Sequence, residues 1–280
     1  MDLLVTTEWL AGHLGDPGLK LLDATYFALD PSRDARAEYE AGHIPGALFL
    51  DLPSLKDKGN PVPFMLPKPE EFAARMTALG VSNEDRIILY DGTQHRTAAR
   101  AWWMARLFGA RNVALLDGGL QKWVAEGRPL TTTVPDAGTG HFVPAFAAEA
   151  VRSMEQVREN LTTQAEQLVD ARGAARFSGA EQDPRPEVAP GHIPGSRNLP
   201  YDRLFNPDGS WKRDATLRAE FAAAGVDLDR PLLTTCGSGV TAAVLLFGAA
   251  LLGKQDVALY DGSWSEWGTH PDTPKETGAA

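Results

Sequence analysis

The sequence predicts an α/β protein made of two similar units, each with a mostly parallel sheet and helices on both faces. Two observations lead to this prediction. The segment AGHIPGA at residues 41–47 recurs as PGHIPGS at residues 190–196, and VALLDGGLQKW at residues 113–123 recurs as VALYDGSWSEW at residues 257–267. Between these markers, apolar stretches of strand length alternate with stretches of helical periodicity, which is typical of parallel sheets with crossover helices.

A shift in composition separates the two units. Residues 131–148 are rich in Thr, Pro, Gly and Ala and show no periodicity, as expected of a connecting segment. We therefore place a linker at residues 136–148, between a first domain at residues 1–135 and a second domain at residues 149–280. The offset between the two copies falls from 149 to 144 positions along the repeat, so one loop differs in length between the domains.

The overall composition argues against several functional classes. The formal net charge is −10, which disfavours nucleic acid or an anionic membrane as a partner, because both would repel an acidic surface. A single cysteine excludes an internal disulfide, as is usual in a reducing compartment. The N-terminus lacks the basic start and apolar core of a signal peptide, and the apolar run near residues 240–252 is too short to span a bilayer. We expect a cytoplasmic protein.

The single cysteine, Cys236, lies where a thiolate forms readily. Residues 230–235 predict a short strand, and residues 240–252 are apolar on all sides, which predicts a buried helix. The cysteine therefore begins the strand-to-helix turn CGSGVT. The positive end of a helix and the backbone N–H groups around it favour the thiolate, which is the reactive form of cysteine. We take Cys236 as the candidate catalytic nucleophile.

The rest of this loop predicts an anion-binding site. Gly237 and Gly239 have no Cβ, so we expect both to take positive φ values and to turn successive N–H groups inward as a nest. The Ser238 hydroxyl is expected to donate to a substrate oxygen, and Thr241 to cap the helix. A lone cysteine is often only a small buried apolar residue, but glycines beside a helix start favour a functional role. The predicted substrate-binding residues of the loop are Gly237, Ser238, Gly239, Val240 and Thr241.

The first domain keeps the loop but lacks the nucleophile. The 144-residue offset places Gly92 opposite Cys236, in the segment DGTQHRTAAR. We therefore expect one active site per chain, in the second domain. His95 and Arg96 in the first-domain loop have the residue types of a catalytic pair, but we interpret them as a solvated loop tip.

The two GHIPG copies, the loop CGSGVTA and the DG(G/S)xxxW endings together resemble the tandem-domain rhodanese sulfurtransferases, and the resemblance covers nearly the whole chain. It implies two rhodanese-like α/β domains with an active cysteine only in the second. The loop is similar to that of members that use 3-mercaptopyruvate. Members that prefer thiosulfate usually carry basic side chains where this chain has Gly237 and Ser238.

The resemblance also implies residues that bind the donor. In members that use mercaptopyruvate, two arginines contact the substrate carboxylate, and the matching positions here are Arg176 and Arg185. A planar guanidinium suits this role, because it binds a carboxylate through two parallel hydrogen bonds and stays charged at any working pH.

A proton relay has been proposed for some members of the family, through a serine, a histidine and an aspartate. Ser238 and Asp51 match two of these residues, but Phe64 stands near the position expected for the histidine. The resemblance therefore does not imply a relay of this type here. Asp51 is a candidate accessory residue, and its alternative role is that of a turn ligand.

The function implied by these residues is sulfur transfer in two steps. The Cys236 thiolate takes sulfur from 3-mercaptopyruvate as a persulfide, pyruvate is released, and an acceptor takes the outer sulfur. The acceptor is a thiol such as thioredoxin or a small thiol, or cyanide. Two alternatives stay open: transfer from thiosulfate, and a persulfide carrier or binding module for a protein partner. A cysteine phosphatase is disfavoured, because the arginine that it needs six positions after the cysteine is Ala242 here.

Other residues with reactive side chains are interpreted as structural. His43 and His192 each precede Ile-Pro-Gly, and we expect both to hydrogen-bond the loop backbone. Six scattered histidines and one cysteine lack the spacing of metal ligands, so we expect no metal and no other cofactor. Four tryptophans in helical patterns are expected in the cores: Trp102, Trp103, Trp264 and Trp267.

Overall fold

The computed structural model of the protein describes residues 1–28 and 30–279, which form two compact units. Each unit is an α/β structure with one five-stranded sheet. Each unit also contains a short segment from the other half of the sequence. Unit 1 comprises Met1–Leu55, Pro67–Ala147 and Phe205–Trp211, and unit 2 comprises Lys56–Leu66, Ala148–Leu204 and Lys212–Ala280.

The sheet of unit 1 has the strand order β1-β5-β4-β2-β3, and its neighbouring strands are parallel. Parallel neighbours need crossover connections, which the intervening helices supply. The central strands are apolar stretches such as LKLLD and RIILY, because strands covered on both faces bury nearly every side chain. The elements are β1 (Leu4–Val5), α1 (Thr7–His13), β2 (Leu19–Asp23), α2 (Ala35–Ala41), β3 (Ala47–Phe49), the 3-10 turn η1 (Leu52–Ser54), α3 (Pro69–Ala78), β4 (Arg86–Tyr90), α4 (Ala98–Leu107), β5 (Asn112–Leu116) and α5 (Gly119–Ala125).

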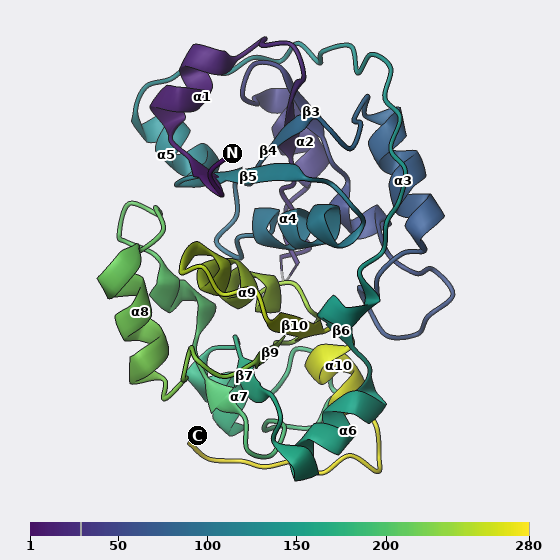
Figure 1. Cartoon of the computed structure of the whole chain (residues 1–280), viewed down its shortest axis with the longest axis vertical. Coiled ribbons are helices and arrows are strands. Elements are labelled where there is room, and N and C mark those ends of the chain that lie inside the picture. Colours follow the sequence, from purple (N-terminus) through teal and green to yellow (C-terminus); the bar gives the residue numbers. More distant parts are fainter. Residues whose placement is uncertain (29, 280) are drawn as a thin grey trace. The chain divides into compact units, whose positions relative to one another are not determined.

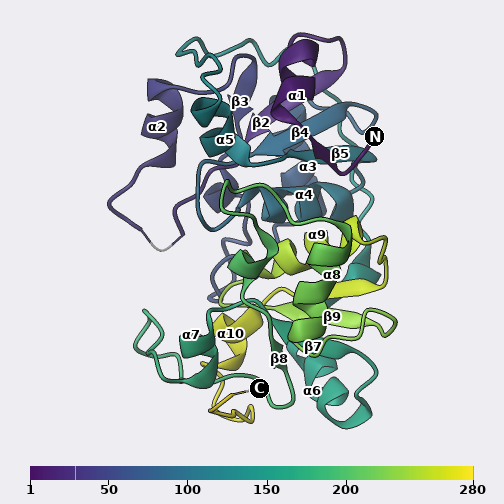
Figure 2. The same cartoon turned by 90° about the vertical axis from the view of Figure 1, so that its left-hand side faces the viewer.

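Helices cover both faces of this sheet, with α1, α2 and α5 on one face and α3 and α4 on the other (Figure 2). On the first face, a buried cluster joins Ile88 of β4 to Leu10 of α1 and Trp123 of α5. On the second face, the Trp102 indole N–H of α4 donates to the Val113 carbonyl of β5 (3.0 Å). Removing these apolar side chains from water is the main favourable term in the stability of the unit.

The sheet of unit 2 repeats this arrangement, with the order β6-β10-β9-β7-β8 and parallel neighbours. Its middle strand is β9, whose carboxyl end leads into the cysteine loop. The elements are the 3-10 turn η2 (Ala148–Ala150), β6 (Val151–Arg152), α6 (Met154–Thr163), β7 (Gln167–Asp170), α7 (Ala174–Ser178), β8 (Arg197–Asn198), the 3-10 turn η3 (Tyr201–Leu204), α8 (Asp214–Ala223), β9 (Leu232–Thr235), α9 (Ala242–Leu251), β10 (Val257–Tyr260) and α10 (Ser263–Trp267).

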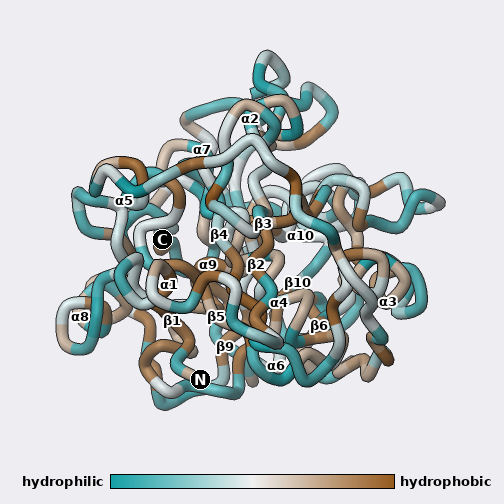
Figure 3. Tube along the Cα trace, turned by 90° about the horizontal axis from the view of Figure 1, so that it is seen from above, coloured by the Kyte–Doolittle hydropathy of each residue, from teal (hydrophilic) through white to brown (hydrophobic). Residues whose placement is uncertain are grey.

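Helix α9 is buried on all sides, as its composition predicts. Every residue from Ala242 to Ala249 is buried, and the helix trace is mostly brown in Figure 3. In Figure 1, α9 lies on one side of β9 and β10, and α6 and α10 lie on the other. On that other side, Val157 of α6 and Trp264 of α10 share a cluster with Leu233 of β9. The middle strand and its loop are therefore held from both faces.

The predicted fold class is confirmed for both units, since each has a parallel sheet with helices on both faces. No helix among the described residues has the length and apolar composition that a membrane span requires. The four tryptophans predicted for the cores are buried: Trp102, Trp103, Trp264 and Trp267.

The two GHIPG histidines hydrogen-bond to backbone, as predicted, but Nδ1 of each bonds to a helix carbonyl and not to the loop. His43 Nδ1 donates to the Tyr39 carbonyl (2.7 Å), and the His43 ring stacks on the Tyr39 ring. His192 Nδ1 donates to the Phe177 carbonyl (2.9 Å), and its ring stacks on the Phe177 ring at 3.7 Å between centroids. Each histidine thus fixes its turn to a neighbouring helix.

The second GHIPG turn provides a test of the fold. Gly191 has a φ of 105°, and an added Cβ would overlap the Glu276 carbonyl oxygen, which as backbone has little freedom to move. We expect Gly191→Ala to lower the free energy of unfolding by about 2 kcal/mol or more. Gly173→Ala is the matched control, because Gly173 has a φ of −56° and no atom within 4 Å of an added Cβ. Thermal unfolding measures both variants, and equal stabilities would contradict the expectation.

Candidate active site

Cys236 directly follows β9, the middle strand of unit 2, and is 2% exposed. Its backbone N–H donates to Ser263 Oγ (3.2 Å), and its carbonyl accepts from the Trp264 N–H (2.9 Å). Both partners belong to α10, so the start of this helix fixes the cysteine at the carboxyl end of the sheet. Open α/β sheets bind their ligands at this end.

The loop conformation agrees with the sequence prediction only in part. Gly239 has the expected positive φ of 76°. Gly237 does not, so the prediction that both glycines take positive φ values is wrong for Gly237. Thr241 stands at the N-cap of α9, but its side chain makes no capping hydrogen bond, because its backbone is already helical (φ −77°, ψ −16°). A single left-handed residue is enough to turn the chain from strand into helix.

Most of the N–H groups of this loop lack acceptors among the described residues. In the described part of the chain, no hydrogen bond satisfies the backbone N–H of four loop residues or of the first helical residue: Gly237, Ser238, Val240, Thr241 and Ala242. Backbone N–H groups in protein interiors are nearly always paired. A cluster of unpaired donors at a helix start has the donor set and the helix dipole that an anion needs.

The two predicted arginines lie together, held by one carboxylate. Arg176 Nη2 donates to Asp183 Oδ2 (2.5 Å), and Arg185 Nε donates to Asp183 Oδ1 (2.9 Å). The Asp183 side chain is 3% exposed. Burial alone would raise the pKa of Asp183, but the hydrogen bonds from Arg185 and Arg176 outweigh it and lower the pKa below its usual value. The carboxylate is therefore ionised at neutral pH.

Both arginines reach the cysteine loop. An added Cβ at Gly237 would lie 3.7 Å from Arg176 Nη2. Arg185 Nη1 donates to Ser265 Oγ, which in turn donates to the Gly237 carbonyl. Arg176 Nε is buried and has no hydrogen-bond partner among the described residues. The structure thus brings Arg176 and Arg185 to the same loop as Cys236 and leaves one buried donor unpaired there.

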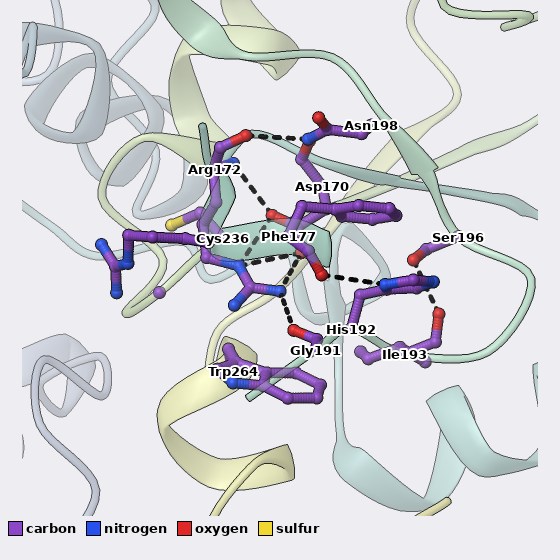
Figure 4. A network of polar contacts seen from close by, with 12 residues as sticks. Asp170, Arg172, Phe177, Gly191, His192, Ile193, Ser196, Asn198, Cys236 and Trp264 are labelled. Atoms are coloured by element: carbon purple, nitrogen blue, oxygen red, sulfur yellow. Dashed lines mark hydrogen bonds and ion pairs between the residues drawn. The ribbon is translucent and has the colours of Figure 1, made fainter. Parts of the chain in front are cut away.

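Figure 4 shows a buried ion pair between Arg172 and Asp170. Arg172 Nη2 donates to Asp170 Oδ2 (2.6 Å) and to the Gly191 carbonyl (2.9 Å). The exposed fractions of the two charged side chains are 3% and 1%. The Arg172 guanidinium also lies over the Trp264 ring, 4.7 Å from its centroid. The pair therefore joins the end of β7, the GHIPG turn and α10.

The equivalent loop of unit 1 corrects the sequence alignment. The Leu120 N–H donates to the Asp91 carbonyl (3.0 Å), just as the Trp264 N–H donates to the Cys236 carbonyl. Asp91, and not Gly92, therefore stands opposite the nucleophile. The offset of 144 failed because residues 91–97, between β4 and α4, are one residue longer than residues 236–241, between β9 and α9.

Asp91 fills the loop of unit 1 with its own carboxylate. Its Oδ2 accepts from the Ala98 N–H at the start of α4 (2.8 Å), and its Oδ1 accepts from the Thr93 N–H (3.0 Å). The interpretation of the neighbouring residues as a solvated tip is wrong for Arg96. Its guanidinium lies over the Phe205 ring, 4.5 Å from the centroid, because residues 205–211 belong to unit 1.

Asp51, the candidate accessory residue, lies in unit 1 just before η1 (Leu52–Ser54). Its carboxylate does not cap that turn, but its carbonyl accepts from Ser54 Oγ (2.7 Å). Phe64 belongs to the segment of unit 2 from the first half of the chain and has a φ of 66°. A role for Asp51 in the chemistry stays a prediction. Within the described residues, no group of three His, Cys, Asp or Glu side chains is arranged to hold a metal ion.

Sequence reasoning missed four polar residues around the site. Arg172 and Asp183 each form an ion pair with a residue that only folding brings near. In the sequence, nothing distinguishes Asp183 among 37 acidic residues. Ser265 gives no sequence signal either. Ser263 does, since it replaces the Gly119 of the first copy in the repeated DGG/DGS motif, and it keeps a positive φ of 50°. A serine in the place of a left-handed glycine indicates a role for its hydroxyl.

Comparison with known proteins identifies the family to which the chain belongs. The model of the Rhodanese-like domain family matches residues 6–126 and 153–270. The chain therefore belongs to the rhodanese-like family and carries two tandem copies of the domain. The resemblance predicted from the sequence is confirmed.

Within this family, the chain is similar to several individual sulfurtransferases. The chain is 42% identical over 273 residues to 3-mercaptopyruvate sulfurtransferase of Escherichia coli (strain K12), with 97% of each chain covered. It is 42% identical over 274 residues to thiosulfate sulfurtransferase of Cricetulus griseus, covering 94% of this chain and 91% of that one. The crystal structure of SseA from Escherichia coli, described as a 3-mercaptopyruvate sulfotransferase, matches with a TM-score of 0.86 at 40% identity and covers 94% of this chain and 99% of that chain.

The Asp91 carboxylate provides a pH test. Burial raises the pKa of Asp91 to about 6, although Arg96 and the N–H groups of Ala98 and Thr93 oppose this. A carboxyl group with a raised folded-state pKa stabilises the fold fully below its unfolded pKa of about 4, and this contribution is lost as pH rises through about 6.

We therefore expect the stability of the wild type relative to Asp91→Asn to fall by about 2 kcal/mol between about pH 4 and about pH 7. Urea unfolding of both proteins at the two pH values measures this change. A difference in stability that is the same at both pH values would show that Asp91 titrates normally.

Proposed function

We propose that this protein is a sulfurtransferase that moves sulfur from 3-mercaptopyruvate, through a persulfide on Cys236, to a thiol or cyanide acceptor. One observation carries the proposal. The single cysteine begins a loop in which five N–H groups lack acceptors among the described residues. Arg176 lies against the next residue of that loop, Gly237, and Arg185 reaches the Gly237 carbonyl through Ser265. A nucleophilic sulfur, a group of N–H donors for an anion and a binding site for a carboxylate therefore occur together. Sulfur transfer from 3-mercaptopyruvate requires all three.

In the first half-reaction, the Cys236 thiolate attacks the thiol sulfur of 3-mercaptopyruvate. A sulfur–sulfur bond forms, the carbon–sulfur bond breaks, and its electron pair leaves with the three-carbon fragment as the enolate of pyruvate, which then takes up a proton. The cysteine is left as a persulfide. No external oxidant or reductant is needed, because the donor carbon is reduced as the transferred sulfur is oxidised.

The arginine pair orients the donor. Arg176 binds the donor carboxylate, since its buried Nε has no other partner among the described residues. Arg185 supports this site and holds the loop through Ser265. The net charge of the three groups Arg176, Arg185 and Asp183 is one positive, which matches a donor with a single carboxylate.

The loop stabilises negative charge on sulfur. The N–H groups of Gly237, Ser238, Val240, Thr241 and Ala242, which lack acceptors among the described residues, lie at the start of α9, where the helix dipole adds to them. They stabilise the thiolate before the reaction and the anionic persulfide after it. The Ser238 hydroxyl donates to the donor carbonyl. Gly239 contributes the turn that shapes the cradle, and Val240 and Thr241 contribute N–H groups.

In the second half-reaction, an acceptor thiolate attacks the outer sulfur and regenerates the Cys236 thiolate, which makes the kinetics ping-pong. The acceptor is a small thiol, a protein thiol such as thioredoxin, or cyanide, and neither nucleic acid nor a membrane takes part.

We place the protein in the cytoplasm, where a free cysteine stays reduced. Residues 1–135 form the non-catalytic domain, 136–148 the linker and 149–280 the catalytic domain, with Asp51 as an accessory residue.

Thiosulfate is the second candidate donor, and the similarity to a protein named thiosulfate sulfurtransferase supports it. Thiosulfate is a dianion, however, and the loop CGSGVT adds no basic side chain to the net charge of one from the arginine pair and Asp183. The balance of charge therefore favours mercaptopyruvate. A persulfide carrier for a protein partner would use the same Cys236 chemistry.

The central test compares the wild type with Cys236→Ser. We expect pyruvate release from 3-mercaptopyruvate in the presence of a reducing thiol, and a mass gain of about 32 Da after donor alone, both lost in the variant. A pyruvate assay and intact mass spectrometry measure the two. Pyruvate release that persists in Cys236→Ser would place the chemistry elsewhere in the chain.

A second test concerns the carboxylate site. Arg176→Ala removes a charge-assisted hydrogen bond, so KM for 3-mercaptopyruvate should rise by about tenfold or more. Persulfide formation on Cys236 at saturating donor should persist, because the nucleophile and its loop are intact. Steady-state kinetics and intact mass give the two readouts, and an unchanged KM would remove Arg176 from the site.

A further inference from the structure

The carboxylate between the two arginines is held by several hydrogen bonds. Asp183 accepts from Arg176 Nη2, from Arg185 Nε and, more weakly, from Arg185 Nη2 (3.3 Å). It also accepts from the Arg185 backbone N–H (3.1 Å). A carboxylate exposed to only 3% is costly to bury, and three hydrogen bonds from two guanidinium groups and one from a backbone N–H offset that cost. Asp183 thus fixes both guanidinium groups.

The two arginines differ in what they have left to bind with. Each of the three nitrogens of the Arg185 guanidinium already donates, to Asp183 or to Ser265. Arg176 donates to Asp183 through Nη2 only, and its buried Nε has no partner among the described residues. The donor carboxylate therefore meets Arg176, while Arg185 connects Asp183 to the Gly237 carbonyl through Ser265.

We infer that Asp183 is a specificity-determining residue, which fixes the position of Arg176 and cancels one of the two positive charges, so that the site selects a monoanionic carboxylate donor over a dianion. This inference rests on the proposed function, since it concerns the donor of the same site. It assigns the choice of donor to a residue outside the cysteine loop.

Two simpler roles for Asp183 make different predictions. If the carboxylate only neutralised charge, its removal would strengthen the binding of every anion, because the site would change from one net positive charge to two. If it only stabilised the fold, its removal would weaken catalysis with every donor by the same factor. A fixed Arg176 together with a cancelled charge instead predicts that removal of the carboxylate lowers the efficiency with mercaptopyruvate and does not lower the efficiency with thiosulfate.

The experiment measures kcat/KM of wild type and Asp183→Asn with 3-mercaptopyruvate and with thiosulfate. Asparagine keeps the size and one acceptor oxygen but removes the charge. We expect the efficiency with mercaptopyruvate to fall by about tenfold or more, as for the loss of an oriented charge-assisted hydrogen bond. The efficiency with thiosulfate should stay or rise. An unchanged ratio of the two efficiencies, or a rise with both donors, would overturn the inference.

Two matched variants serve as controls. Ser265→Ala breaks the connection between Arg185 and the Gly237 carbonyl, leaves Asp183 in place, and should lower both efficiencies without changing their ratio. Glu166→Gln breaks another acid–arginine pair of unit 2, in which Arg152 Nη2 donates to Glu166 Oε1 (2.8 Å), and should change neither efficiency. Thermal unfolding of all variants verifies that each is folded under the assay conditions.

Alkylation of Cys236 separates failure of this inference from failure of the proposed function. Iodoacetate carries one carboxylate and iodoacetamide is its neutral analogue, and neither requires sulfur transfer. The rate of alkylation by iodoacetate, divided by the rate with iodoacetamide, should fall by about threefold or more in Asp183→Asn. The reason is that the fixed Arg176, which orients a carboxylate, is lost. If the wild type uses neither sulfur donor, the proposed function fails. An unchanged alkylation ratio would overturn the assignment of Asp183 whether or not sulfur is transferred.

Discussion

The buried ion pair of Asp170 and Arg172 is the interaction on which the candidate site depends. Its two charges are almost fully removed from water, so each requires the other, and loss of either partner would leave an uncompensated buried charge. Through the Gly191 carbonyl and the Trp264 ring, the pair joins the GHIPG turn and α10 to the end of β7. Helix α10 in turn binds the backbone of Cys236. The buried ion pair therefore helps to fix the position of the nucleophile.

The same loop architecture serves opposite purposes in the two units. In unit 1 the N–H groups of Ala98 and Thr93 bind the carboxylate of Asp91. In unit 2 the equivalent position holds a thiol, and the N–H group of Ala242 at the start of α9 has no acceptor among the described residues. Burial raises the pKa of Asp91, because an ionised carboxylate is less stable in the protein interior than in water. A single side chain at the end of the middle strand thus decides whether the cradle is filled from within or is free for an outside anion.

Much of the fold could be predicted from the sequence, because repeated motifs and apolar periodicity are local signals. The position of Cys236 between strand and helix and the structural role of His43 and His192 followed from such signals. The alignment of Gly92 with the cysteine failed, since a one-residue difference in loop length is invisible when the loop sequences have diverged. Asp183 and Ser265 could not be found, because their importance comes from partners that only tertiary packing brings near.

Each unit includes a segment from the other half of the chain. Residues 205–211 belong to unit 1, where the Trp211 N–H donates to Asp117 Oδ1 (2.9 Å) and Lys122 pairs with Asp208. In unit 2, Asp261 Oδ2 accepts from the Leu66 N–H (2.7 Å). During synthesis on the ribosome, unit 1 therefore stays incomplete until residue 211 has emerged, well after its own sheet. The two halves cannot mature independently, and cutting the chain at the linker would remove a segment from each.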